Sequence, residues 1–209
     1  MLLFHLFQVT KEGWHFCSVC EIQAPPRTWH CNVCNVCVLK REHHCGFTGC
    51  CIGFYNFRFF FYFLLYLFVS TIYATYFTHS FLWSSVDETN FTHIIRILIP
   101  LSIIFFGIDT SWTQVYIFYY SVTIIGLGFS GVMLYQQFHV LFHNQTSYDR
   151  NKSNSTYNHN LKTNIRDSLG TRWYLTWVSP FLESPLPHRG TEWQHSPTQC
   201  YQDEIAKAE

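Results

Sequence analysis

Two long stretches of apolar residues dominate the pattern of the sequence. Residues 57–76 consist mostly of Phe, Tyr, Leu and Val, and their only charge is Arg58. Residues 115–135 form a second stretch, which ends before a polar pair of glutamines. Because about 20 apolar residues suffice to cross the hydrocarbon core of a bilayer, the pattern predicts a transmembrane helix at 57–83 and another, with a cytosolic extension, at 115–143. A buried helix of a soluble protein is the alternative for the first stretch.

The connection over 84–114 contains a shorter apolar segment, 94–108, which Arg96 and Pro100 interrupt. Its length fits a re-entrant or interfacial element as well as a third span. The connection holds Arg96 as its only basic residue, and the positive-inside rule therefore places it in the lumen and the basic flanks of the spans in the cytosol. The flanking basic residues are Lys40, Arg41, Arg58, Arg150 and Lys152. The glycosylation sequon at Asn90 would then be lumenal.

The other segments are more polar. Residues 1–16 form a short N-terminal segment without a signal-peptide pattern. Residues 144–187 form a cytosolic region, and its tryptophans and prolines over 173–186 indicate an interfacial segment. We expect 188–209 to be a disordered tail, in which the isolated Cys200 has no assigned role. The sequence predicts no internal repeat.

Composition fits a membrane protein and excludes one class of function. Aromatic residues make up 20% of the chain and charged residues only 12%, which suits a chain that is half lipid-facing. The formal net charge is zero, so the chain lacks the basic surface that nucleic-acid binding requires. The predicted fold class is an α-helical multi-pass membrane protein with a small cytosolic cysteine-rich domain that binds two zinc ions.

A cluster of metal-binding residue types precedes the first span. It contains eight of the nine cysteines together with three histidines, namely Cys17, Cys20, His30, Cys31, Cys34, Cys37, His43, His44, Cys45, Cys50 and Cys51. Short Cys-x2-Cys spacings let neighbouring thiolates bind one tetrahedral zinc ion. The intervening segment is too polar to bury a core, so we expect a metal to stabilise its fold. Disulfides are the weaker alternative, because they belong to secreted chains.

The cluster offers more donors than two zinc ions need. Two tetrahedral sites take eight ligands, and eleven are available, but spacing alone does not show which three are left over. A thiol that is not a ligand, beside a histidine and the carboxylate of Glu42, is the arrangement of an activated nucleophile. The alternative is that Cys45 is a spare or weakly bound ligand, and spacing favours neither interpretation.

Residues 17–56 also carry a family resemblance. They read Cys-x2-Cys-x4-Pro-x-Arg-x2-His-Cys-x2-Cys-x2-Cys-x4-Glu-His-His-Cys-x5-Cys-x-Gly-x2-Asn. Without a gap, this pattern resembles the cysteine-rich domain of the DHHC-type protein S-acyltransferases (palmitoyltransferases). The resemblance implies two structural zinc ions, with all four positions of each filled by protein, and a free cysteine that carries an acyl group.

Carried over by position, the resemblance implies a role for each residue of the cluster. One zinc ion would take Cys17, Cys20, His30 and Cys37. The other would take Cys31, Cys34, His44 and Cys51. Cys45 is then the implied nucleophile, His43 its base, and Glu42 the carboxylate that orients the histidine, as in a catalytic triad. Cys50 stands where the family usually has asparagine and is not an implied ligand.

The sequence departs from the family pattern in three respects. Glu42 replaces the usual aspartate and is one methylene longer, and small displacements of a catalytic group can cost large factors in rate. Gly46 and Phe47 replace proline and tryptophan; Gly46 loosens the backbone, while Phe47 can still line an acyl-binding cavity. The family places two membrane helices, which contribute walls to that cavity, before the zinc domain. Here sixteen residues precede Cys17. We therefore expect either a shortened gene product or a fragment, or an acyl-binding cavity whose missing walls other segments supply.

A second resemblance follows the second span. Residues 144–149, which include Thr146, are similar to the family's TTxE motif, with differences at its second threonine and its glutamate. Tyr157, Asn164 and Gly170 are spaced like the aromatic, asparagine and glycine of the family's C-terminal motif, in which Asn164 would be a structural hydrogen-bonding hub. The alternative is an ordinary polar loop.

These resemblances imply a protein S-palmitoyltransferase that uses palmitoyl-coenzyme A. We expect a Golgi or endoplasmic reticulum membrane protein whose zinc domain faces the cytosol. Its partners would be the lipid bilayer and substrate proteins with membrane-proximal cysteines. The alternative is a catalytically inactive relative that acts as a membrane-bound zinc adaptor for partner proteins. A RING-like ligase is disfavoured, because the cross-brace spacing of its metal ligands is absent from the sequence.

Overall fold

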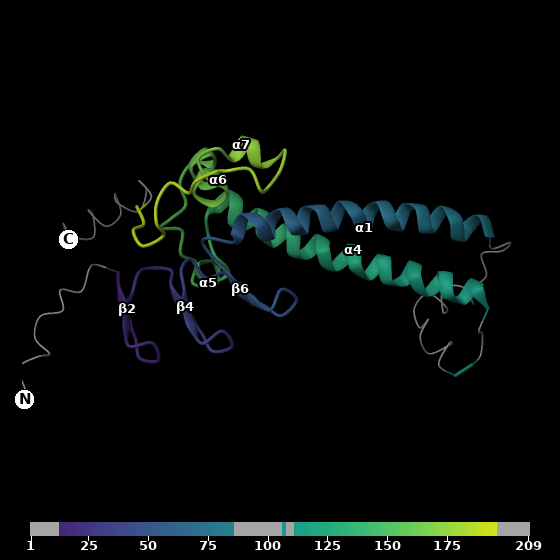
Figure 1. Cartoon of the computed structure of the whole chain (residues 1–209), viewed down its shortest axis with the longest axis horizontal. Coiled ribbons are helices and arrows are strands. Elements are labelled where there is room, and N and C mark those ends of the chain that lie inside the picture. The colour runs from purple at the N-terminus through teal and green to yellow at the C-terminus, as the bar shows by residue number, and fades with distance from the viewer. Residues whose placement is uncertain (1–12, 86–105, 108–110, 196–209) are drawn as a thin grey trace, which may run out of the picture. The chain divides into compact units, whose positions relative to one another are not determined.

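The computed structural model describes residues 13–85, 106–107 and 111–195 (Figure 1). The expectations for residues 1–12, for the Asn90 sequon, for nearly all of the apolar segment 94–108 and for Cys200 lie outside these residues. The chain divides into two compact units, which are described separately: Phe61–Gln136, and the combination of Met1–Phe60 with Gln137–Glu209.

Two long helices contain the predicted spans, α1 (Phe57–Ser85) and α4 (Trp112–His143). Both are long and apolar enough to cross a membrane, so the prediction of two such helices is confirmed. Their 29 and 32 residues correspond to about 43 and 48 Å at 1.5 Å per residue. Both helices are therefore longer than the ~30 Å hydrocarbon core of a bilayer, and longer than the apolar stretches from which they were predicted.

Within Phe61–Gln136 the two helices run antiparallel and approach closely where their side chains are small. Thr71 Oγ1 and Ser130 Oγ lie 3.3 Å apart, and His79 Nδ1 lies 3.0 Å from the Tyr120 hydroxyl. A Cβ atom at Gly131 would lie 3.1 Å from the Phe68 ring, so glycine is what permits this approach. Small residues and interhelical hydrogen bonds are the usual means of helix association in membranes.

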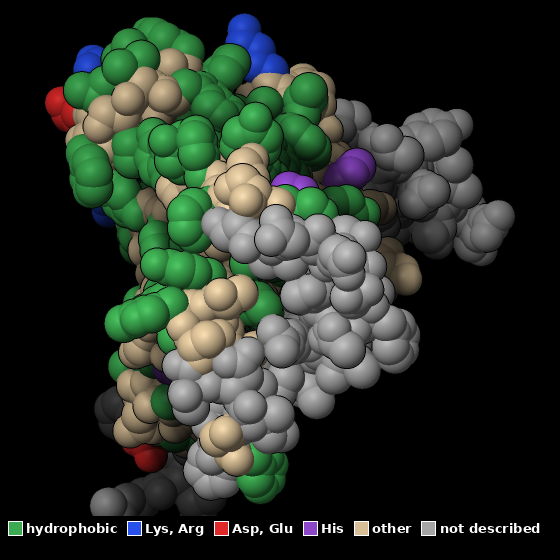
Figure 2. Space-filling model, turned by 90° about the vertical axis from the view of Figure 1, so that its right-hand side faces the viewer, with side chains coloured by type: hydrophobic (Ala, Val, Ile, Leu, Met, Phe, Trp, Pro, Cys, Tyr) green, Lys and Arg blue, Asp and Glu red, His purple; other side chains and the backbone are tan. Residues whose placement is uncertain are grey.

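The outward surfaces of the two helices are apolar. Large side chains that a soluble protein would bury are half or more exposed, among them Val69, Tyr73, Tyr76, Phe77, Tyr119, Ile125, Phe129, Val132 and Tyr135. Figure 2 shows a face of the molecule on which hydrophobic side chains predominate and charged ones are few. An apolar surface of this extent indicates contact with lipid or another apolar partner.

The other unit contains three antiparallel hairpins of two short strands each. They pair β1 (His15–Cys17) with β2 (Ile22–Ala24), β3 (Trp29–Cys31) with β4 (Val36–Val38), and β5 (His43–Cys45) with β6 (Cys50–Ile52). Short strands of this kind bury little apolar surface, so their stability has to come from elsewhere.

Three short helices follow α4, namely α5 (Ser147–Asn151), α6 (Leu161–Leu169) and α7 (Trp173–Thr176). Beyond them the chain packs back onto the hairpin unit, because the rings of His188 and Trp193 contact Phe54 at 5.0 and 5.7 Å. A disordered tail from residue 188 onward is therefore wrong for residues 188–195. The hydrophobic pattern of residues 188–195 does not predict this contact, because it depends on three aromatic rings that are far apart in the sequence.

Candidate functional site

The three hairpins repeat one structural unit every fourteen residues. Each has a three-residue strand, a four-residue loop and a second three-residue strand. Each first strand ends in a cysteine, at Cys17, Cys31 and Cys45. Each loop ends in a residue with positive φ, at 54° in Glu21, 53° in Asn35 and 66° in Gly49. The prediction of no internal repeat is therefore wrong. The repeat was missed because the three units share backbone geometry and a few metal-binding residues, and little other sequence.

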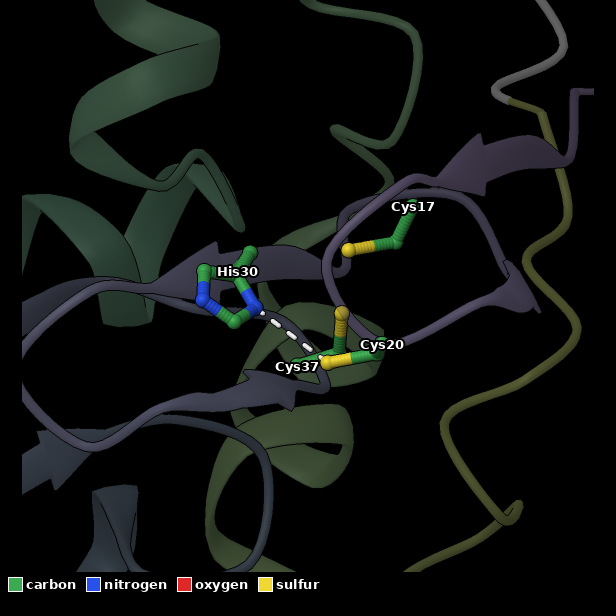
Figure 3. Close-up of side chains that lie close together, drawn as sticks. All are labelled: Cys17, Cys20, His30 and Cys37. Atoms are coloured by element: carbon green, nitrogen blue, oxygen red, sulfur yellow. Dashed lines mark hydrogen bonds between the residues drawn. The ribbon is translucent and has the colours of Figure 1, made fainter.

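The first cluster joins the loop of the first hairpin to a cross-strand pair of residues in the second hairpin. Cys17, Cys20, His30 and Cys37 have ligand atoms within 4.8 Å of one another, and Figure 3 shows their side chains converging. Cys20 Sγ lies 3.2 Å from His30 Nδ1. His30 and Cys37 are directly opposite each other in the β3–β4 hairpin, so antiparallel pairing places both side chains on one face.

The second cluster follows the same rule one repeat later. Cys31 and Cys34 come from the loop end of the second hairpin, and His44 and Cys51 are the opposite pair in the third. Cys34 Sγ lies 3.3 Å from His44 Nδ1. The structure thus gathers the same two sets of four residues that the family resemblance implies. Three sulfur donors and one nitrogen within this distance suit tetrahedral zinc. The eight cysteines that the structure describes are free of disulfide bonds.

Cys45 occupies the loop end of the third hairpin, and no fourth hairpin follows within the described residues. Thr48 stands where the first two loops have their second cysteine. Cys45 is buried, with 8% of its surface exposed. Burial raises the pKa of its thiol, but hydrogen bonds from the Thr48 side chain and from the backbone N–H groups of Thr48 and Phe47 outweigh burial and hold that pKa below the ordinary value. The loop therefore makes this thiol more acidic than an ordinary cysteine.

His43 lies on the same face of β5 as Cys45, because side chains two residues apart in a strand share a face. His44, between them, points to the opposite face and joins the second cluster. The His43 ring packs edge-on against Phe60 at 5.4 Å. Its Nε2 atom is buried and has no hydrogen-bond partner among the described residues. Burial, then the charges of Arg41 and His44, lower the pKa of His43, which favours the neutral form of the ring.

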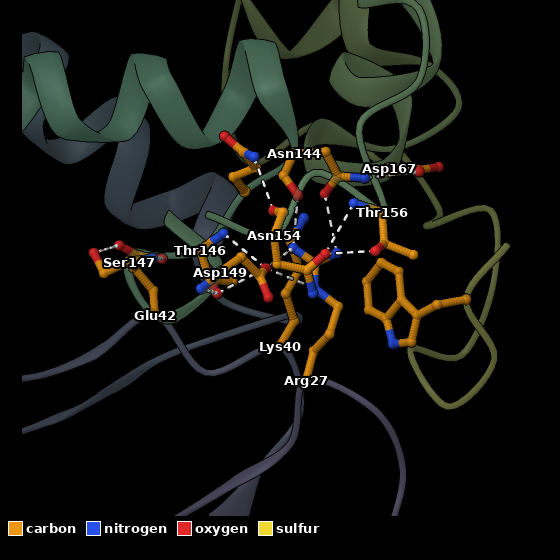
Figure 4. Close-up of polar contacts among 12 residues, drawn as sticks. Arg27, Lys40, Glu42, Asn144, Thr146, Ser147, Asp149, Asn154, Thr156 and Asp167 are labelled. Carbon is orange, nitrogen blue, oxygen red and sulfur yellow. Dashed lines mark hydrogen bonds and ion pairs between the residues drawn. The ribbon is translucent and has the colours of Figure 1, made fainter. Parts of the chain in front are cut away.

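Glu42 is anchored by a residue more than a hundred positions away. One of its carboxylate oxygens accepts a short hydrogen bond from the Ser147 hydroxyl, and the other accepts one from the Ser147 backbone N–H at 2.9 Å (Figure 4). Burial raises the pKa of Glu42, and the two bonds from Ser147 oppose that rise. Ser147 is the second position of the TTxE-like motif, so the structure gives this motif a direct contact with the cysteine-rich domain.

The rest of the TTxE-like motif forms a capping box. Thr146 is the N-cap of α5; its hydroxyl accepts from the Asp149 N–H, and the Asp149 carboxylate accepts from the Thr146 N–H. This reciprocal pairing satisfies two backbone donors at the start of the helix. It fixes Ser147 within the first turn, where it reaches Glu42. Thr146 is itself almost fully buried.

Arg27 links the same capping box to the hairpins. Its guanidinium forms a buried ion pair with Asp149 at 2.9 Å and donates to the Asn144 carbonyl oxygen at 2.7 Å. It also lies over the Tyr157 and Trp193 rings, at 4.7 and 4.4 Å from their centroids. Figure 4 shows the Arg27 side chain extending toward Asp149 and Asn144. The network was not predicted; its one sequence signal is the arginine within the family pattern.

Lys40 lies beside this network and is almost fully buried. Its Nζ donates to Ser168 Oγ at 3.3 Å and lies over the Trp193 and Phe57 rings at 5.5 and 5.8 Å. Burial, and after it the charge of Arg27, lowers the pKa of Lys40 to about 7. The lysine thus packs against two aromatic rings, and its hydrogen bond to Ser168 joins the hairpins to α6.

Arg27→Ala is expected to destabilise the hairpin unit by about 3–5 kcal/mol, because it leaves Asp149 buried without its ionic partner. Chemical unfolding of the purified protein in detergent, followed by tryptophan fluorescence, measures the loss. Arg166→Ala is the matched control: Arg166 is exposed, and we expect a change within about 0.5 kcal/mol. Equal effects of the two substitutions would contradict the structural role of the ion pair.

Asn164 is fully buried and makes several hydrogen bonds. Its side chain donates to the carbonyl oxygens of Phe142 at 2.6 Å and His159 at 3.2 Å, and accepts from the His159 N–H at 3.0 Å. It therefore ties α6 to the end of α4. Gly170 ends α6 with a φ of 97°, and a Cβ there would collide with Ser184.

Two further residues of the third hairpin are exposed. Phe47, the candidate acyl-binding residue, lies in the β5–β6 loop with 80% of its surface exposed. Cys50 is exposed and belongs to neither metal cluster. It stands directly opposite Cys45 in the hairpin.

Comparisons with known proteins agree with this geometry. The family described as DHHC palmitoyltransferase matches residues 10–154. The chain is 33% identical over 180 residues to the probable palmitoyltransferase ZDHHC24 of Danio rerio, which covers 86% of this chain and 61% of that protein. It is 32% identical over 184 residues to the probable palmitoyltransferase ZDHHC24 of Mus musculus, covering 88% of this chain and 65% of that one. The chain thus spans less than two thirds of the length of these relatives.

Proposed function

Because the chain belongs to the DHHC palmitoyltransferase family, we propose that it is a protein S-palmitoyltransferase with Cys45 as its nucleophile. The observation that carries this proposal is the position of Cys45. It ends the first strand of the third hairpin, as the ligand cysteines end theirs, yet it lies outside both metal clusters and beside His43. A thiol that is stabilised as a thiolate and bound to no metal is free to act as a nucleophile.

The proposed reaction has two half-reactions. His43 takes the proton of the Cys45 thiol, and the Cys45 sulfur attacks the thioester carbonyl of palmitoyl-coenzyme A. The carbon–sulfur bond to coenzyme A breaks, and its thiolate leaves with the proton from His43. In the second half-reaction His43 takes the proton of a substrate-protein cysteine, whose sulfur attacks the carbonyl carbon of the acyl-Cys45 thioester. The carbon–sulfur bond to Cys45 breaks, and the departing Cys45 thiolate takes the proton back from His43. Such a ping-pong scheme is typical of covalent catalysis.

Two zinc ions in the Cys/His clusters would supply structural cross-links and no reactive position, because protein atoms fill all four positions of each. The ligands then fix the register of β5 and β6, and with it the faces on which His43 and Cys45 lie. Glu42 is proposed to orient the backbone and ring of His43 from its anchor on Ser147, while Asn164 and Thr146 hold the region that carries this anchor.

The cellular setting is proposed on the same basis. The two apolar helices would place the cysteine-rich domain in the cytosol, at the surface of a Golgi or endoplasmic reticulum membrane. The exposed Phe47 would contact the acyl chain where it leaves the lipid phase. Substrate proteins would then present cysteines close to the membrane surface.

Separation of the two half-reactions tests the proposal. Protein loaded with a clickable palmitoyl group is freed of acyl-coenzyme A and then mixed with an acceptor protein that carries a membrane-proximal cysteine. We expect the label to move to the acceptor through a hydroxylamine-sensitive bond. A loaded protein that retains its label in the presence of several such acceptors would argue against the transferase.

Two observations favour the second candidate, an inactive zinc adaptor. Both carboxylate oxygens of Glu42 are bonded to Ser147, and the Nε2 atom of His43 lacks a described partner. A histidine that no carboxylate orients would be a poor base. The adaptor would bind zinc and partner proteins normally but would acquire no acyl group on Cys45.

Ser147→Ala is expected to lower the rate of Cys45 acylation by about 10²-fold, because Glu42 loses its anchor and the neighbouring His43 is displaced. Ser147→Thr, which restores the family's usual residue and keeps the hydroxyl, should retain most of the rate. Both variants should still bind two zinc ions. The measurement is the initial rate of acyl loading from palmitoyl-coenzyme A, and an unchanged rate in Ser147→Ala would show that this contact is not used.

A further inference from the structure

We propose that Cys50 is a second S-acylation site, which receives its acyl group from Cys45 of the same chain. The proposal rests on the proposed function, because it requires an acyl group on Cys45. It concerns a residue that is neither a member of a metal cluster nor part of the reaction described above. The juxtaposition that carries it is the direct pairing of Cys45 with Cys50 across the β5–β6 hairpin.

The register of the hairpin places the two thiols together. Directly opposite residues in an antiparallel pair have Cα atoms about 4.5–5.5 Å apart and side chains on one face. The neighbouring pair, His44 and Cys51, uses the opposite face to form the second metal cluster. Cys50 therefore lies on the face of Cys45 and His43, and its thiol is kept away from the metal ligands.

Thr48 lies between the two cysteines. Cys50 Sγ donates to Thr48 Oγ1 at 3.5 Å, and Thr48 Oγ1 donates to the carbonyl oxygen of Cys45 at 3.5 Å. The same loop that stabilises the Cys45 thiol thus also contacts the Cys50 thiol. The Thr48 hydroxyl group thus contacts both the thiol of Cys50 and the backbone of Cys45.

The other two hairpins show that a cysteine is not needed at this position for the fold. The residues opposite Cys17 and Cys31 are Ile22 and Val36, and both are exposed, at 47% and 49%. An aliphatic side chain therefore completes the same hairpin in both metal-binding repeats. The stability of the third hairpin therefore does not require a cysteine at position 50, and the Cys50 thiol is available as a reactive group.

The difference in burial gives the transfer a use. Cys45 is 8% exposed, whereas Cys50 is exposed. A substrate cysteine in a second protein reaches an exposed thioester more easily than a buried one. Cys50 would thus carry the acyl group from the buried loading site to the surface, beside the exposed Phe47 ring.

The transfer is a balanced thioester exchange. The Cys50 sulfur attacks the carbonyl carbon of the acyl group on Cys45, and a new carbon–sulfur bond forms as the bond to Cys45 breaks. The proton of the Cys50 thiol passes to the departing Cys45 thiolate. No oxidant, reductant or further reactant takes part. One alkyl thioester replaces another, so comparable amounts of label are expected on the two cysteines once exchange is complete, and a positioned neighbour makes the exchange fast.

Mapping of the label over time tests this proposal. The full chain in detergent or in membranes receives alkynyl palmitoyl-coenzyme A, samples are quenched at intervals, and fragment ions of the peptide spanning residues 42–58 separate Cys45 from Cys50. We expect label on Cys45 first and on Cys50 later in the wild type. In Cys50→Ser we expect thioester on Cys45 alone. In Cys45→Ser we expect label on Cys50 to fall by about 100-fold or more, because acyl-coenzyme A in solution replaces a positioned donor.

A matched control moves the second thiol away from Cys45. In Cys50→Ser combined with Ile22→Cys, an exposed cysteine occupies the equivalent position of the first hairpin, and we expect no label on residue 22. Label there at the wild-type rate, or label on Cys50 that persists in Cys45→Ser, would overturn transfer from Cys45. Label that stays on Cys45 and never reaches Cys50 would overturn it too, while the proposed function would stand. A wild type without label on either cysteine would refute both proposals.

Discussion

Replacement of Cys45 by serine is expected to abolish palmitoyl transfer. Loss of the nucleophile in a covalent mechanism lowers kcat by on the order of 10⁶-fold, which a transfer assay registers as complete loss. The physical reason is that hydrogen bonds from Thr48 and Phe47 lower the pKa of the Cys45 thiol. A serine hydroxyl is far less acidic than a thiol, so it would stay protonated and be a poor nucleophile. Multiple-turnover release of coenzyme A in the presence of an acceptor cysteine measures the effect.

The same variant provides its own control for folding. Cys45 lies outside both metal clusters, so Cys45→Ser should bind two zinc ions per chain and unfold at the same denaturant concentration as the wild type. A folded, zinc-loaded Cys45→Ser protein that still turns over at a tenth of the wild-type rate would remove Cys45 from the mechanism.

Removal of one ligand of the second cluster is expected to have the largest effect on stability. A structural zinc ion contributes roughly 10–16 kcal/mol to the folding of a small domain, which exceeds the total stability of most domains. Cys31→Ala should therefore reduce bound zinc from two ions to one and release the third hairpin, which this cluster holds through His44 and Cys51. Cys45 would then lose both its environment and its acyl loading.

Zinc content by elemental mass spectrometry and limited proteolysis measure this effect together. We expect new cleavage within residues 31–56 of Cys31→Ala. Val33→Ser is the matched control, because Val33 lies in the same loop and is 74% exposed; it should keep two zinc ions and the wild-type cleavage pattern. Two retained zinc ions in Cys31→Ala, with the wild-type cleavage pattern, would mean that Cys31 is not needed to hold zinc at the second cluster.

Spacing predicted the presence of the metal clusters but left three donors unassigned. Cys-x2-Cys pairs are local, so the sequence shows them directly. The choice between Cys45, Cys50 and Cys51 depends on which face of a hairpin each residue occupies. A one-residue shift of register would exchange the faces. The structure pairs His44 with Cys51 and Cys45 with Cys50, and the family resemblance alone had implied that choice.

The repeat was accessible from the sequence, although it was not predicted. Cys17, Cys31 and Cys45 are spaced by fourteen residues, as are His30 and His44 within the series. The repeated Cys-x2-Cys spacing is lost in the third hairpin, because Thr48 replaces its second cysteine. That replacement, and the absence of a following hairpin in the described part of the chain, explain in physical terms why Cys45 lies outside both metal clusters.

Contacts between distant segments were the least predictable part of the site. The buried ion pair of Arg27 with Asp149 joins residues 122 positions apart, and Glu42 meets Ser147 across 105 positions. No local periodicity encodes such pairs, since each depends on how α5 packs onto the hairpins. The one local signal is the Thr146-x2-Asp149 spacing, which forms a capping box at the start of α5, but no helix was predicted from it.

The most direct measurement is the intact mass of the purified protein after a single incubation with palmitoyl-coenzyme A. We expect the mass to increase by that of palmitoyl groups. Neutral hydroxylamine should remove this increase, which should appear in protein with two zinc ions bound and be missing from Cys45→Ser. A folded protein with both zinc ions whose mass does not change, or an acyl group that forms equally well in Cys45→Ser, would contradict the claim that Cys45 is the nucleophile of an acyltransferase.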